Sequence, residues 1–125
     1  MKSLSVVSVP VSDPERAKNF YIDKLGFTLI ADATFGDGLR WLQVGIAGAQ
    51  TSLTLVTWFD EMPAGSLRGL VIDCDDIETT YRTLIERGVV FHAPPAEQPG
   101  GLFAMLSDPD GNVLALHQAG NPITR

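Results

Sequence analysis

Two side chains of this sequence combine acid–base chemistry with positions in apolar, strand-like segments: Asp73 and His117. A carboxylate and an imidazole can exchange protons with a substrate, so together they form a candidate catalytic acid–base pair. Each also has a plainer interpretation, because Asp73 fits a solvated strand edge and His117 fits a strand end half in solvent. His92, the other histidine, runs into Ala93-Pro94-Pro95 and is expected at a rim or on the surface.

Thiol and metal chemistry have little support in the sequence. The single cysteine, Cys74, excludes an internal disulfide and a cysteine-based zinc cage. Its apolar strand favours a buried packing role over a reactive thiol. A metal site built around His92 and His117 is disfavoured, because no carboxylate lies at a ligand-like spacing from either histidine.

The elements that must position these residues occur twice. A short apolar strand leads into a helix capped by Asp13, and the same pattern returns with Asp76, 63 positions later. Gly26 and Gly88 are expected to end the two helices. Three strand-like segments follow each helix, at 27–30, 39–44 and 52–58 and then at 89–92, 102–106 and 112–117. The order βαβββ, repeated once, predicts an α+β fold, with a Pro- and Gly-rich loop at 93–101.

The length of 125 residues fits one domain over 1–125. We expect module 1 at about 1–60, a linker at about 59–67 and module 2 at about 67–120. A module of about 60 residues is marginal alone, so the two modules should share a core. With 45% apolar and 19% charged residues, and no apolar run of membrane-spanning length, we expect a cytoplasmic protein that does not bind membranes. The net charge of −6 argues against nucleic acid as a partner.

Strand alternation predicts one face against the helices and a second face, called the mixed face, that carries apolar and polar side chains. Its predicted polar and aromatic members are Ser8, Ser52, Thr54, Trp58, Asp73 and His117, with Val6, Val56, Gly69, Val71, Val113 and Ala115 between them. The strand at 39–44 leaves two choices, because either Arg40-Leu42-Val44 or Trp41-Gln43 could face inward. Arg40 could instead pair with a surface acid. Phe103 and Met105 are expected in the core, and the alternative is that either forms part of the wall of the cleft in module 2.

Several motifs together resemble the vicinal oxygen chelate superfamily, which includes glyoxalases, bleomycin-resistance proteins and extradiol dioxygenases. They are 11–17 (VSDPERA), Phe20-Tyr21, 25–27 (LGF), 75–77 (DDI), 87–89 (RGV) and 108–112 (DPDGN). The resemblance implies that each βαβββ module curls its sheet around a concave cleft, with the helix outside. Residues 108–112 also fit a tight hairpin turn, so their expected role is structural.

Metal-dependent members of that superfamily hold a divalent ion with His or Glu side chains at four inward-facing positions. Carried onto this sequence, those positions are Val6, Thr54, Gly69 and Ala115. None offers a carboxylate or an imidazole, and transition metals need about three such ligands. The resemblance therefore predicts no metal at this site, and no other cofactor is expected.

The predicted function is the binding of a small organic molecule, cationic or aromatic, in the cleft of a bleomycin-resistance-like homodimer. Ser8, Ser52, Thr54, Trp58, Asp73, His117, Arg40 and Trp41 are the predicted ligand-binding residues. The alternative is a lyase, isomerase or dioxygenase that uses a metal or a metal-free acid–base pair, for which His117 and Asp73 are the candidates. A structural or interaction module is a third interpretation, which a filled cleft would favour.

Overall fold

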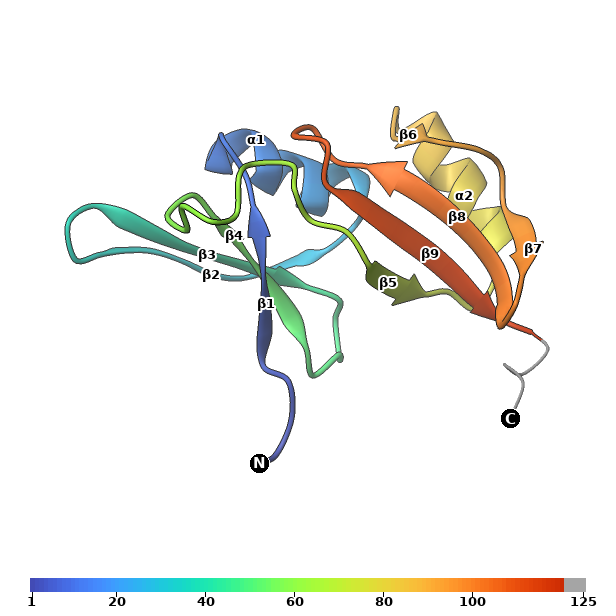
Figure 1. Cartoon of the computed structure of the whole chain (residues 1–125), viewed down its shortest axis with the longest axis horizontal. Coiled ribbons are helices and arrows are strands. Elements are labelled where there is room, and N and C mark those ends of the chain that lie inside the picture. The colour runs from blue at the N-terminus through green and yellow to red at the C-terminus, as the bar shows by residue number, and fades with distance from the viewer. Residues whose placement is uncertain (121–125) are drawn as a thin grey trace.

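The computed structural model describes residues 1–120 and contains two βαβββ modules side by side (Figure 1). Module 1 consists of β1 (Val6–Pro10), α1 (Pro14–Asn19), the π-helical turn η1 (Phe20–Lys24), β2 (Thr28–Phe35), β3 (Leu39–Gly45) and β4 (Ser52–Val56). Module 2 consists of β5 (Leu70–Asp73), α2 (Ile77–Glu86), β6 (Val90–Phe91), β7 (Ala96–Gln98), β8 (Gly101–Ser107) and β9 (Val113–Ala119). The α+β prediction is confirmed. Residues 121–125 of the predicted domain lie outside the described residues.

The two sheets have equivalent topologies. Their strand orders are β1-β4-β3-β2 and β5-β9-β8-β6, and the first pair in each sheet is parallel while the others are antiparallel. The predicted loop at 93–101 contains β7, which pairs with β8 as an additional edge strand. The β2 strand is longer than predicted, because its residues through Phe35 pair with β3 to form a long hairpin that extends away from module 2 (Figure 1).

Equivalent capping contacts start both helices. The Asp13 carboxylate accepts a hydrogen bond from the Arg16 amide, and the Asp76 carboxylate accepts one from the Thr79 amide, each at 3.2 Å. These bonds satisfy amides at the helix start that have no intrahelical partner. Gly26 and Gly88 end the helical segments with φ of 81° and 85°, a left-handed conformation that favours glycine. None of the helices in residues 1–120 is long and apolar enough to cross a membrane.

One hydrophobic core joins the modules, as the size of each half predicts. It contains side chains of the strands and helices of both modules; the largest fully buried ones are Tyr21, Leu42, Leu55, Ile77, Leu106 and Leu114. The strand residues predicted to face the helices, such as Val9 and Leu116, belong to it. The side chains on the helix-facing side of both sheets pack in this core, and the mixed faces lie outside it.

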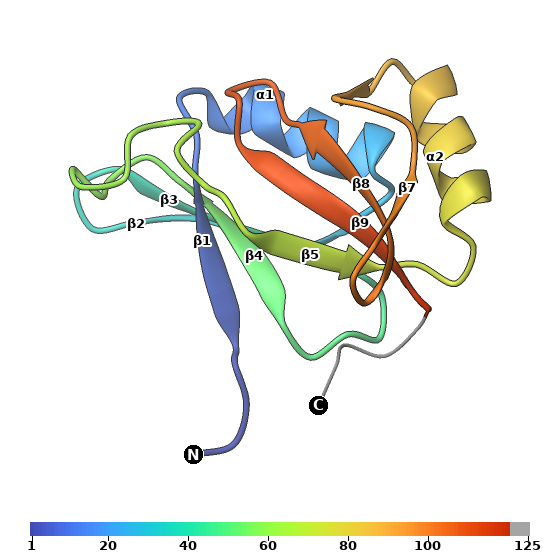
Figure 2. The ribbon, with the colours of Figure 1, turned by 45° about the vertical axis from the view of Figure 1, so that its right-hand side comes forward.

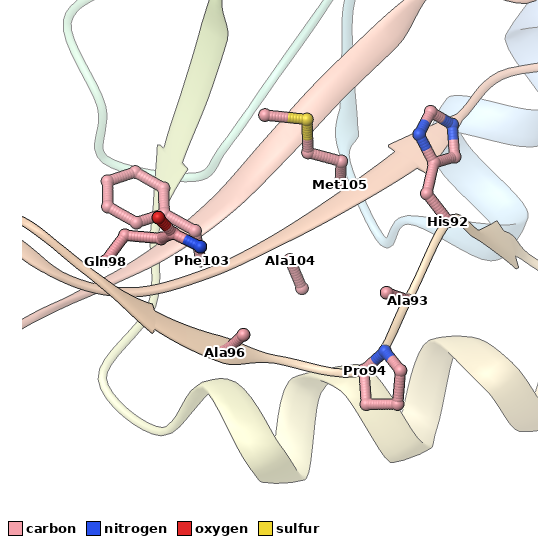
Figure 3. A pocket seen from close by; sticks show the side chains of 8 residues that line it. All are labelled: His92, Ala93, Pro94, Ala96, Gln98, Phe103, Ala104 and Met105. Carbon is pink, nitrogen blue, oxygen red and sulfur yellow. The ribbon is translucent and has the colours of Figure 1, made fainter.

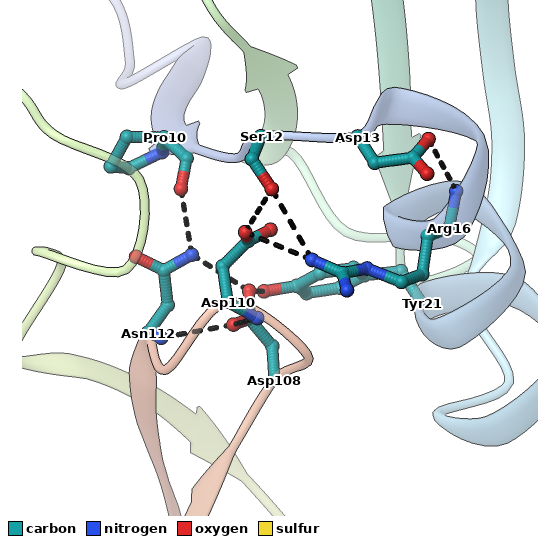
Figure 4. Close-up of polar contacts among 8 residues, drawn as sticks. All are labelled: Pro10, Ser12, Asp13, Arg16, Tyr21, Asp108, Asp110 and Asn112. Atoms are coloured by element: carbon teal, nitrogen blue, oxygen red, sulfur yellow. Dashed lines mark hydrogen bonds and ion pairs between the residues drawn. The ribbon is translucent and has the colours of Figure 1, made fainter.

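The turn at 108–112 connects β8 to β9 and forms a buried polar junction with module 1 (Figure 4). The Asn112 amide donates to the Pro10 carbonyl at 2.8 Å and to the Asp108 carboxylate at 2.7 Å, while its oxygen accepts from the Leu67 amide at 3.0 Å. The Tyr21 hydroxyl donates to Asp108 at 2.9 Å. Burial, reinforced by the Asp108 charge, raises the pKa of Tyr21 far above its usual range, so this hydroxyl remains a donor.

Further contacts between the modules surround this junction. In Figure 4 the Asp110 carboxylate accepts hydrogen bonds from Ser12 and from Arg16, the latter at 3.1 Å. Figure 2 shows α1 beside the turn between β8 and β9. At the other end of the helical segment, the Lys24 ammonium donates to the Arg87 carbonyl at 2.7 Å and the Arg87 guanidinium donates to the Lys24 carbonyl at 2.9 Å. Lys24 and Arg87 are equivalent positions of the two modules.

Replacement of Asn112 tests the junction. We expect Asn112→Ala to lower the free energy of unfolding by about 2 to 4 kcal/mol, because the substitution leaves the Pro10 carbonyl and the Leu67 amide without their partner. Chemical denaturation measures the loss. Arg82→Ala is the control, since its ion pair with Glu78 is exposed and 3.7 Å long, and it should cost less than about 0.5 kcal/mol. Equal effects of the two substitutions would contradict the assignment.

Candidate ligand site

The strand registers place the predicted mixed-face residues of module 1 together. In the parallel pair, Ser8 lies opposite Thr54, and Gln43 of β3 lies opposite Thr54 on the other side. Cross-strand partners project from the same face of a sheet. Their side chains are hydrogen-bonded: the Ser8 and Thr54 hydroxyls are 3.3 Å apart, and the Gln43 amide donates to the Ser52 hydroxyl at 2.7 Å. The sheet centre therefore carries a row of short polar side chains that already have partners.

The structure also decides the orientation of β3. Leu42 and Val44 are fully buried in the core, so Trp41 and Gln43 lie on the mixed face. The indole N–H of Trp41 donates to the Gln43 side-chain oxygen at 3.0 Å, which extends the polar row. Gln43 was left open by the sequence, because both sets of alternating residues on this strand include large side chains.

Arg40 lies on the opposite face of the sheet from Trp41, and it adopts the alternative that the sequence allowed, which is pairing with acidic side chains. Its guanidinium donates to both oxygens of Asp32, each at 2.8 Å, and to Glu15 in the first turn of α1 at 2.7 Å. The alternation of β3 places Arg40 on the same side as Leu42, facing the helix. Hydrogen bonds from Arg40 and Lys18 lower the pKa of Asp32 well below its usual range. Arg40 belongs to this charged cluster and not to the mixed face.

Aromatic side chains border the polar row. The Phe35 ring lies 5.8 Å from Trp58 and 6.5 Å from Trp41, both edge to face. Trp58 also contacts Phe59 of the linker, with 6.0 Å between the rings. Trp58 thus borders the mixed face and also packs beside the linker. Phe35, which is not among the predicted site residues, completes the group.

Module 2 contributes a pocket of about 520 Å³ over its mixed face (Figure 3). Its lining is His92, Ala93, Pro94, Ala96, Gln98, Phe103, Ala104 and Met105. Phe103 and Met105 lie opposite His117 and Ala115, so they project from the mixed face and not into the core, which corrects the prediction for both. Met105 is 50% exposed. Both faces of β8 carry apolar residues, so the sequence of this strand gives no signal that separates the residues of the core from those of the mixed face.

The predicted pair of Asp73 and His117 meets at one end of this face. These residues are direct partners across the parallel β5–β9 pair, and His117 Nδ1 lies 2.6 Å from Asp73 Oδ1. The other ring nitrogen, Nε2, lies 2.9 Å from the Gly100 carbonyl oxygen. The hydrogen bond with Asp73, followed by the one with Gly100, raises the pKa of His117 above its ordinary value. His92, in contrast, is exposed and lies 2.8 Å from the Ser107 hydroxyl, at the rim as predicted.

The four positions at which related proteins hold a metal do not form a donor set here. Thr54, only 1% exposed, has its hydroxyl beside Ser8, and Val6, Gly69 and Ala115 offer no donor side chain. Across residues 1–120, no group of three or more His, Cys, Asp or Glu side chains is placed to hold an ion. A transition metal needs such a group, so these residues do not fit one. The mixed face instead offers an apolar surface with few polar groups, which suits an organic ligand.

Comparison with known proteins agrees with this geometry. Residues 3–116 match the model of the Glyoxalase/Bleomycin resistance protein/Dioxygenase superfamily. The chain belongs to this superfamily. It is similar to TnmS3, an antibiotic binding protein from Streptomyces sp. CB03234, with 50% identity, a TM-score of 0.91 and coverage of 96% of this chain and 98% of that one. A superfamily member from Sphaerobacter thermophilus DSM 20745 gives 34% identity and a TM-score of 0.89, covering 94% and 98%.

A sequence relative covers the chain to the same extent. The Bacillus subtilis protein YetH, described as uncharacterized, is 36% identical over 121 residues, which cover 94% of this chain and 99% of YetH. Each of these matches extends through both modules of this chain.

Substitutions in β8 test which residues line the mixed face. We expect Met105→Ala to change the free energy of unfolding by less than about 1 kcal/mol, because Met105 is half exposed. Leu106→Ala removes a fully buried side chain of the core and should cost about 2 to 5 kcal/mol. Denaturation by guanidinium compares the two variants. A larger loss for Met105 than for Leu106 would reverse the assignment of faces.

Proposed function

We propose that this protein binds a small aromatic organic molecule on its mixed faces and acts by sequestration, without a metal. The observation that carries the proposal is the pocket of about 520 Å³, whose lining combines Phe103, Met105 and Pro94 with few polar groups. A pocket of this size and composition suits a drug-sized ligand. The 50% identity with an antibiotic binding protein supports the same class of function, in a protein that we infer to be cytoplasmic.

The distribution of charge favours a cationic ligand over an anionic one. The chain has a net charge of −6. Among the strands of residues 1–120, Arg40 is the one basic Lys or Arg residue, and it lies on the helix-facing side. At the edge of the mixed face of module 2, Asp73 and His117 form a pair 2.6 Å apart, so neither contributes an uncompensated charge. Aromatic rings such as Trp41 and Trp58 attract a cation to their faces as well.

We further propose that the site is completed in a homodimer. The pocket of module 2 is lined by that module alone, while the aromatic group of module 1 lies on the other sheet. Several large apolar side chains on or beside the mixed faces are exposed; they are Phe35, Val71, Val90 and Met105. Pairing of two copies through these faces would cover the exposed apolar surface, which is the usual driving force for association.

The enzymatic alternative has less support from this site. Lewis-acid chemistry requires a bound ion, and the four inherited positions supply no donor set for one. The acid–base alternative requires a ring nitrogen of His117 that faces a substrate, but both nitrogens face protein oxygens at 2.6 and 2.9 Å. Non-covalent binding, in contrast, requires an apolar pocket and aromatic side chains, and the site has both.

Titration with matched probes tests the binding proposal. We expect N-methylacridinium to bind more tightly than neutral acridine at pH 8, because the two rings are alike and one carries a permanent charge. Trp41→Ala and Phe103→Ala should each weaken N-methylacridinium binding about tenfold, the loss expected for one aromatic contact with a cation. Isothermal titration calorimetry measures both affinities.

Arg40→Gln is the matched control for Trp41→Ala, because it changes the neighbouring residue on the opposite face of the same strand. Its affinity for N-methylacridinium should stay within twofold of the unmodified protein. Absence of heat with both probes, or an equal loss in the Arg40 variant, would contradict the proposed site.

The homodimer has its own test. Analytical ultracentrifugation should give twice the 13.5 kDa mass of the chain. Val71→Glu places a charge on the exposed mixed face of module 2 and should shift the population toward monomer, because charge burial in an apolar interface is unfavourable. Glu86→Lys, on the exposed end of α2, is the control and should leave the mass unchanged. A monomer at all concentrations would refute the dimer.

A further inference from the structure

The surroundings of His117 determine how many protons its ring carries. Nδ1 lies 2.6 Å from the Asp73 carboxylate, and Nε2 lies 2.9 Å from the Gly100 carbonyl. Both partners are acceptors, because a carboxylate and a carbonyl have no proton to donate. A neutral imidazole has one N–H, so it can serve one partner while its lone pair faces the oxygen of the other. Only the doubly protonated ring donates to both.

A third neighbour favours the same state. The Phe103 ring lies 4.6 Å from the imidazole, tilted by 37°, and its π face attracts a positive charge. Phe103 is also part of the pocket lining, directly opposite His117 in the β8–β9 pair. The charge on His117 therefore attracts the Phe103 ring, which a ligand in this pocket would contact.

The charged groups around His117 leave this arrangement unopposed. Asp73 is the charged partner on β5, and neither β8 nor β9 contains a charged residue apart from His117 itself. On β7, Glu97 pairs with Leu102 and so projects from the other side of that strand than Ala96 and Gln98. The hydrogen bonds with Asp73 and Gly100 raise the pKa of His117, and partial burial opposes them.

Through its contact with Gly100, the His117 ring holds the turn between β7 and β8. Gly100 lies in the turn from β7 to β8, and β7 supplies Ala96 and Gln98 to the pocket lining. The bond from His117 ties that turn to β9, in addition to the bond between the Gly120 amide and Gly100. Loss of one ring proton removes a donor, either from Gly100 or from Asp73.

We propose that His117 is an imidazolium at neutral pH and a positioning residue, which holds Phe103 and the turn after β7 in place for ligand capture. The ring is then a fixed donor to two protein oxygens and not a general base. This proposal rests on the proposed binding function for its effect on affinity, while the protonation state stands independently of any ligand.

The direction of the pH dependence follows from the raised pKa. Because folding raises the pKa of His117 above its unfolded value, its contribution to stability is complete below the unfolded pKa and is lost as pH rises through the folded pKa. Affinity for neutral acridine should fall over the same interval, since acridine itself does not change charge there.

Nitrogen-15 NMR of the imidazole groups, without ligand, tests the protonation state. At pH 7 we expect both nitrogens of His117 to be protonated. Asp73→Asn should lower the midpoint of the His117 titration, because it removes the negative partner. Asp75→Asn is the matched control, with the same charge change two residues away and no bond to His117. A singly protonated ring at pH 7, or equal shifts in both variants, would overturn the proposal.

Acridine titrations at pH values on both sides of the His117 midpoint that NMR finds then test the positioning role. The unmodified protein should lose affinity as the ring loses its proton. His117→Gln keeps a side-chain donor that does not titrate, so its affinity should be independent of pH in the same range. An unchanged pH profile in His117→Gln would refute the positioning role. Failure of acridine to bind at every pH would refute the proposed function instead, and the NMR result would still decide the charge of His117.

Discussion

The buried hydrogen bonds of Asp108 and Asn112 hold the two modules in one relative arrangement. These side chains are 5% and 0% exposed, respectively, and their partners come from β1, from the helical segment after α1 and from the chain that precedes β5. Buried polar groups without partners are costly, so the turn at 108–112 can pack in this place only when module 1 presents Pro10 and Tyr21 to it. The network thereby fixes the position of one module against the other.

This constraint determines which surfaces remain for function. Both helix-facing sides of the sheets enter the shared core, so the mixed faces are the sheet surfaces that lie outside it. The centre of the module 1 face is a row of short side chains whose hydroxyl and amide groups bond to one another, from Ser8 and Thr54 to Gln43. Groups that are already paired offer little to a new partner. The aromatic borders and the pocket over β8 are therefore the adaptable parts of the site.

Much of the fold could be predicted from local chemistry. The capping residues Asp13 and Asp76, the glycines that end both helices and the alternation of β1, β4, β5 and β9 each carry their signal within a few neighbouring positions. The duplication then predicted that the two sheets share one strand order, since equivalent segments of the two modules occupy equivalent positions in their sheets. The pairing of Asp73 with His117 across two strands was predicted at the level of a shared face, and the register brings them into direct contact.

Other features could not be predicted, for identifiable reasons. The orientation of β3 is undecided by its sequence, because Arg40, Trp41 and Leu42 are all long side chains that suit either face. Phe103 and Met105 are apolar residues on a strand whose other face is also apolar, so composition does not separate core from pocket. The bond between Tyr21 and Asp108 joins residues 87 positions apart, and only the packing of the two modules brings them together.

The four positions at which metal-dependent members of the superfamily hold an ion separate the proposed site from a metal centre. A metal site concentrates the binding free energy in three or four strong donors at one point. Here the corresponding positions on the two sheets are Val6, Thr54, Gly69 and Ala115, and the hydroxyl of Thr54 is already beside that of Ser8. The proposed function would therefore spread recognition over many weaker contacts with rings and methyl groups. Such contacts act through area and shape, so under that proposal His117, whose ring lies 4.6 Å from that of Phe103, would contribute by holding the Phe103 ring in place.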